Sequence, residues 1–122
     1  MDKPPVYQKK RTTISIAGKT NPLKAAQSAI RFIGDGKLPE FLYIGGNAGQ
    51  QAMKSMGILR FQFDQQNEGR SLAFQPYRVL CLTKHPITEE EKEKDGVVWK
   101  TVIISQKEED KNEFAPKQES VG

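Results

Sequence analysis

The first half of the chain alternates short apolar runs with segments of helical periodicity. Residues 13–17 (Thr-Ile-Ser-Ile-Ala) alternate polar and apolar side chains, which predicts a half-buried strand ending at Gly18. Asn21-Pro22 predicts the start of a helix, with asparagine as N-cap and proline in the first turn. Gly34-Asp35-Gly36 ends that helix. The side chains expected on its buried face are Leu23, Ala26, Ile30 and Ile33.

A second strand and a second helix follow in the same order. Residues 41–44 (Phe-Leu-Tyr-Ile) form a short apolar run, which predicts an interior strand covered on both faces. Gly45-Gly46 ends this strand, and Asn47 is predicted to cap the next helix. The side chains expected on the buried face of that helix repeat every three or four residues: Ala48, Ala52, Met56, Leu59 and Phe63.

The second half of the chain predicts a pair of strands. Residues 71–83 follow a polar loop and are strand-like, and Pro76 within them indicates an edge strand or a bulge. Residues 84–96 are strongly charged and predict a connection or a hairpin tip, and residues 97–105 form the last strand. The order β-α-β-α-β-β predicts an α/β fold, a two-layer sandwich with a mixed four-stranded sheet and two helices on one face. The first three strands are expected to run parallel, and the last two to form an antiparallel hairpin.

The length of 122 residues suits one domain. We expect a basic flexible arm at 1–11, the folded domain at 12–105 and a charged flexible tail at 106–122. The sequence shows neither an apolar run of about 20 residues nor an apolar N-terminal segment, so it predicts no membrane span and no secretory signal. An intracellular location, in the cytoplasm or the nucleus, is therefore expected.

Charge is unevenly distributed along the chain. The chain has 19 Lys and Arg against 15 Asp and Glu, a formal net charge of +4. Residues 1–37 are net basic, whereas residues 84–122 are net acidic. A basic first third favours a polyanionic partner, and ordinary surface charge explains it equally well.

Few residues suit catalysis or metal binding. The single cysteine, Cys81, and the single histidine, His85, exclude an internal disulfide framework and a multi-histidine metal site. We expect Cys81 in the core and His85 as an ordinary loop residue. No pair of carboxylates has a spacing that suggests acid–base catalysis, so the sequence predicts a non-enzymatic protein without a cofactor.

Two glycine-containing junctions follow the first two strands. Gly18-Lys19-Thr20 lacks a phosphate-loop glycine, because position 13 is threonine, and the junction at residues 45–49 lacks a dinucleotide fingerprint, because position 44 is isoleucine. Both junctions should open at one edge of the sheet, where lysines and amides could contact phosphates without reading sequence, and a merely polar edge is the alternative. The candidate residues, including a basic arm expected close by, are Lys9, Lys10, Arg11, Lys19, Thr20, Asn21, Lys24, Asn47, Gln50, Gln51 and Lys54.

The residues at these junctions also resemble a known family. Residues 14–22 read Ile-Ser-Ile-Ala-Gly-Lys-Thr-Asn-Pro, and residues 44–54 read Ile-Gly-Gly-Asn-Ala-Gly-Gln-Gln-Ala-Met-Lys. The second stretch is similar to the Ile-Gly-x-Gly-x-x-Asn-Gln-Ala-x-Lys signature of the stage V sporulation protein S branch of the Alba superfamily. Residues 58–60 and 72–76 continue the resemblance, which covers residues 12–105.

The resemblance implies the same β-α-β-α-β-β fold, a homodimer or a heterodimer with a related chain, and non-enzymatic binding to DNA or RNA. It places Lys19 at the lysine that contacts nucleic acid, and Arg78 and Lys84 on a hairpin that follows the groove. This chain lacks the basic residue that archaeal members carry around Gly46-Asn47, and Glu89-Glu90-Glu91 at its hairpin tip should repel phosphate.

A structural or adaptor subunit of a larger protein assembly is the alternative function. The dimer face and the charged tails would then contact proteins. The acidic hairpin, Trp99 and the Pro/Lys tails favour this alternative.

Overall fold

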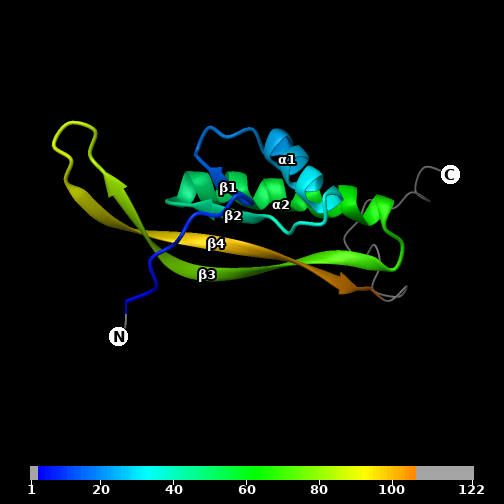
Figure 1. Ribbon diagram of the computed structural model, residues 1–122. Coiled ribbons are helices and arrows are strands. Elements are labelled where there is room, and N and C mark those ends of the chain that lie inside the picture. Colours follow the sequence, from blue (N-terminus) through cyan, green and yellow to red (C-terminus); the bar gives the residue numbers. More distant parts are fainter. Residues whose placement is uncertain (1–2, 107–122) are drawn as a thin grey trace.

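A computed structural model describes residues 3–106, and its elements follow the predicted order (Figure 1). The expected tail lies outside these residues apart from Gln106. The structure shows the predicted α/β fold with a four-stranded mixed sheet and two helices. The elements are β1 (Thr13–Ile16), α1 (Pro22–Gly34), β2 (Glu40–Tyr43), α2 (Gly46–Gln66), β3 (Arg70–Lys84) and β4 (Glu91–Ser105).

The strand order in the sheet is β1-β2-β4-β3. β1 pairs with β2 in parallel, and β4 is antiparallel to both β2 and β3. The three strands that follow or precede helices therefore share one direction, as predicted, and β4 lies between β2 and β3. Pro76 lies in the edge strand β3, which confirms the edge position indicated by the sequence.

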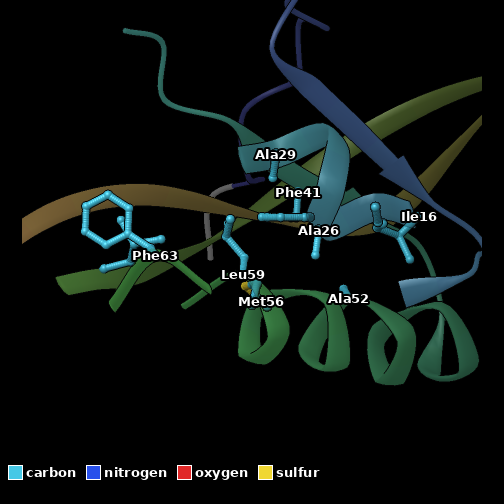
Figure 2. Packing of buried hydrophobic residues seen from close by; sticks show 10 residues of the cluster. Ile16, Ala26, Ala29, Phe41, Ala52, Met56, Leu59 and Phe63 are labelled. Atoms are coloured by element: carbon cyan, nitrogen blue, oxygen red, sulfur yellow. The ribbon is translucent and has the colours of Figure 1, made fainter. Parts of the chain in front are cut away.

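The main core lies between the helices and one face of the sheet. Figure 2 shows Ala26 of α1, Ala52 of α2 and Phe41 of β2 pointing into the same space. All five residues predicted for the buried face of α2 are buried. The buried face of α1 is centred on its three small residues Ala25, Ala26 and Ala29, so the prediction for Leu23 is wrong: its side chain is 47% exposed.

The N-terminal segment is packed against the sheet, in contrast to the flexible arm that we expected. The backbone of residues 5–7 pairs with the outer edge of β3, where Tyr7 N–H donates to Leu80 C=O (2.9 Å) and Leu80 N–H donates to Pro5 C=O (2.8 Å). Residues 5–10, here called the strap, then cross to β1 on the sheet face opposite the helices, here called the open face (Figure 1). The side chain of Tyr7 covers a second small core cluster on that face: Leu42, Val79, Cys81 and Val98.

A buried carboxylate fixes the strap to the sheet. Glu40 is only 6% exposed, and it accepts hydrogen bonds from Tyr7 Oη (2.8 Å) and Lys10 Nζ (3.0 Å). Burial alone would raise the pKa of Glu40, but these two hydrogen bonds and the lysine charge leave it below its ordinary value. Burial, together with the adjacent carboxylate, raises the pKa of Tyr7 to about 12.

Gly49 is required for the close approach of α2 to β2. A Cβ at this position would lie 2.9 Å from the ring of Tyr43, whose hydroxyl accepts a hydrogen bond from the Trp99 indole (3.1 Å). Gly49→Ala should therefore destabilise the protein by about 1–3 kcal/mol in urea denaturation. Gly57→Ala, on the same helix with free space around it, should stabilise by up to about 1 kcal/mol. Equal effects of the two substitutions would contradict this explanation.

Candidate nucleic-acid interface

The junction between β1 and α1 is a tight turn held by its own polar side chains. Thr20 Oγ1 accepts a hydrogen bond from Ala17 N–H (2.8 Å). Asn21 is the N-cap of α1, as predicted, and its Oδ1 accepts from Leu23 N–H (2.9 Å) and Lys24 N–H (3.4 Å). The oxygens of Thr20 and Asn21 thus accept hydrogen bonds within the chain and shape the turn. At this junction the exposed Lys19 is the group best suited to contact a phosphate, because it carries the positive charge.

At the junction between β2 and α2, the helix does not start where the sequence predicted. α2 begins at Gly46 with Gly45 as its N-cap, so the prediction that Asn47 caps the helix is wrong. Gly45 has a φ of +89°, a conformation that glycine adopts without strain, and the helix starts two residues earlier than predicted. No side chain caps α2, and its first turn has no acidic residue. Its first N–H groups and the positive end of its dipole therefore favour an anion.

The two junctions lie against each other, as the sequence predicts for neighbouring parallel strands. A Cβ at Gly18 would lie 3.3 Å from the Cβ of Asn47, and Gln51 Nε2 donates to Gly18 C=O (3.3 Å). Asn21 and Lys54 line the same groove between α1 and α2. Lys19, Lys24 and Gln50 are exposed.

The charge of the helical layer favours a polyanion. α1 carries Lys24 and Arg31 and no acidic residue. α2 carries Lys54 and Arg60, and its first acidic residue is Asp64, close to its C-terminal end and 3.8 Å from Arg60. The half of α2 that joins the candidate interface is therefore free of acidic side chains.

The basic residues of the N-terminal segment do not join this interface. Lys9, Lys10 and Arg11 precede β1, whereas Lys19 follows it, so one strand length of about 13 Å separates them. Lys10 is also paired with Glu40. The prediction that these residues lie close to Lys19 is therefore wrong.

The chain is without a match in two comparisons with known proteins: neither a family model nor a curated protein matches it. The candidate interface is therefore defined by the geometry and charge of its own residues.

The β3–β4 hairpin projects from the same end of the sheet as the candidate interface (Figure 1). β2 pairs with β4 only as far as Val97, so the outer part of both long strands extends beyond the rest of the sheet. Arg78 is paired with Asp95 (3.1 Å), and Lys84 lies directly across from Glu91. Both basic residues that we expected on this hairpin thus have an acidic neighbour, which reduces their attraction for phosphate.

The remaining chemistry-bearing residues have structural positions. Cys81 is buried, as predicted, and burial raises the pKa of its thiol. His85 lies in the hairpin tip, where its Nδ1 accepts from Ile87 N–H (3.1 Å) and Thr88 N–H (3.2 Å). Trp99 is partly buried and packs against the main core. Within residues 3–106, no cluster of side chains suits a metal ion, and no helix is long and apolar enough to cross a membrane.

We did not predict from the sequence that acidic and basic side chains lie on opposite faces of β4. Residues 91–95 alternate acidic and basic side chains, and we interpreted them as a charged connection or tip. The structure places them in β4, where alternation with a period of two sends the acids to one face and the lysines to the other. The strict alternation itself was the signal that could have revealed this.

Proposed function

We propose that the protein binds DNA or RNA without enzymatic activity and with little sequence preference, and that it acts as a dimer in the cytoplasm. The observation that carries this proposal is the contact between the Gly18-Lys19 turn and the uncapped start of α2. Lys19, Lys24 and Lys54 would neutralise phosphates, and the first N–H groups of α2 would donate hydrogen bonds to a phosphate oxygen.

Low sequence preference follows from the kind of contacts available. Lysines, backbone N–H groups and the amides of Asn47, Gln50 and Gln51 can bind phosphate oxygens at any sequence. The start of α2 is the most informative position to alter, because helix stability and anion binding respond there in opposite directions.

Asn47→Asp tests this proposal. A carboxylate in the first turn of α2 should stabilise the helix by about 0.3–1 kcal/mol through the helix dipole. The same negative charge should weaken binding to duplex DNA by about tenfold at about 50 mM salt, because it lies where the phosphate would bind. Fluorescence anisotropy and urea denaturation measure the two effects. Gln62→Glu adds the same charge about 22 Å further along α2 and should leave affinity nearly unchanged. Equal weakening by both variants would contradict a phosphate site at the start of α2.

A structural or adaptor role has one specific observation in its favour. The groove between α1 and α2 has an apolar floor formed by Pro22, Leu23, Gly57, Ile58 and Phe61. Leu23 and Phe61 are 47% and 46% exposed, so this groove offers apolar surface to a protein partner or a second copy of the chain. Binding to a protein that persists at high salt, without bound nucleic acid, would favour this second candidate.

A further inference from the structure

The open face of the sheet carries the lysines of β4, and the helix-side face carries its acids. Trp99 packs into the main core between sheet and helices, so odd-numbered residues of β4 face the helix side. Glu91, Glu93 and Asp95 share that side, and Lys92, Lys94 and Lys100 lie on the open face. The acidic hairpin therefore has one basic face.

An exposed aromatic side chain lies beside these lysines on the open face. Tyr77 is directly across from Val98, next to the pair formed by Gln75 and Lys100. Lys100 Nζ lies 4.9 Å from the centroid of the Tyr77 ring, and Tyr77 Oη donates to Gln75 Oε1 (3.2 Å). The ring is nonetheless 44% exposed. An aromatic ring, a cation and an amide thus occupy one uncovered part of the sheet surface.

No exposed acid opposes them on the described part of this face. The residues of β3 that share it, from Ala73 to Thr83 at every second position, are uncharged. The acid that β2 contributes to this face, Glu40, lies directly across from Lys100, but it is buried beneath the strap and paired with Lys10. The strap itself adds only basic charge through Lys9 and Lys10, next to the exposed Arg11.

We propose that this part of the open face binds single-stranded nucleic acid, with one unpaired base stacked on Tyr77 and a phosphate bound by Lys100. The proposal rests on the proposed function and adds a second surface to it. An exposed aromatic ring on a flat sheet can stack an unpaired base, which duplex DNA keeps within its own helix, whereas the lysines attract the backbone of either polymer. The two polar neighbours of Tyr77 also fit this partner. Lys100 can move from the Tyr77 ring to a phosphate when a base stacks on the ring, and the Gln75 amide can hydrogen-bond a base edge.

Tyr77→Ala tests the stacking contact in the full chain. We expect the affinity for a single-stranded oligonucleotide of about 16 nucleotides to fall by about 5–100-fold, since stacking on one aromatic ring contributes that much. The affinity for duplex DNA should change by less than about twofold. Tyr77→Phe keeps the ring and should retain single-strand binding. Phe61→Ala removes an equally exposed aromatic side chain from α2 and should leave single-strand binding unchanged.

Photo-cross-linking gives an independent readout. A single-stranded probe containing 5-iodouracil should form its cross-link to the peptide that contains Tyr77, and Tyr77→Ala should abolish that cross-link. If Tyr77→Ala binds the single strand as tightly as the wild type while Lys19→Glu does not, the stacking proposal is wrong and the proposed function stands. If Phe61→Ala weakens binding as much as Tyr77→Ala, the stacking proposal is also wrong. If the wild-type chain binds neither polymer, both proposals are overturned.

Discussion

Lys19→Glu should weaken binding to duplex DNA by at least about tenfold at about 50 mM salt. The substitution removes the proposed phosphate contact and places a negative charge beside the uncapped start of α2. The slope of log K against log salt should also become shallower, by about one for the lost contact alone. Fluorescence anisotropy over a range of salt concentrations measures both quantities.

Lys37→Glu is the matched control for this substitution. Lys37 is an exposed lysine in the connection between α1 and β2, so it lies at the opposite end of β2 from the candidate interface. Lys37→Glu changes the net charge by the same amount as Lys19→Glu, and its effect on DNA affinity should be limited to weak long-range repulsion. If both substitutions weaken binding equally, Lys19 is not at a phosphate contact and only the net charge of the protein matters.

Glu40→Ala should destabilise the protein by about 2–4 kcal/mol at about pH 7. The substitution removes the acceptor of the Tyr7 and Lys10 hydrogen bonds and releases the strap from the sheet. Tyr7 covers the buried cluster around Val79 and Cys81, so release of the strap also exposes apolar surface. Urea denaturation measures the loss. The exposed Glu68→Ala should change stability by less than about 0.5 kcal/mol.

The same carboxylate predicts a pH dependence with a definite sign. The folded-state pKa of Glu40 is below its unfolded value of 4.5. Its ionised form therefore contributes stability above that pH, and the contribution is lost as the pH falls through the folded-state pKa. The difference in unfolding free energy between wild type and Glu40→Ala should be largest near pH 7 and should shrink at about pH 3. A difference that stays constant over this range would show that charge at Glu40 contributes nothing.

The fold class could be predicted from the sequence because the local signals agree with one another. The alternation at 13–17, the Asn21-Pro22 helix start and the periodic residues of α2 each indicate the element that the structure contains. The exact start of α2 could not be predicted, since a favourable cap residue at Asn47 competed with a glycine turn at Gly45. The prediction that Leu23 is buried was wrong because three alanines, rather than the larger apolar residues, form the buried face of α1.

The candidate site was only partly predictable, because long-range pairing positions most of its residues. The meeting of the Gly18 turn with α2 followed from two parallel strands, and the structure confirms it. The position of the strap depends on Glu40, a single acid at the start of β2 that carries no local sequence signal. The charge separation on β4 could be predicted only if residues 91–96 were known to form a strand and not a loop.

One titration tests the proposed function most directly. The wild-type protein is titrated against labelled duplex DNA and against labelled single-stranded RNA at about 50 and 200 mM salt. Three phosphate contacts, by Lys19, Lys24 and Lys54, predict micromolar or tighter binding that weakens by about 10–50-fold between the two salt concentrations. Absence of binding to both polymers at the lower salt concentration would contradict the proposed function.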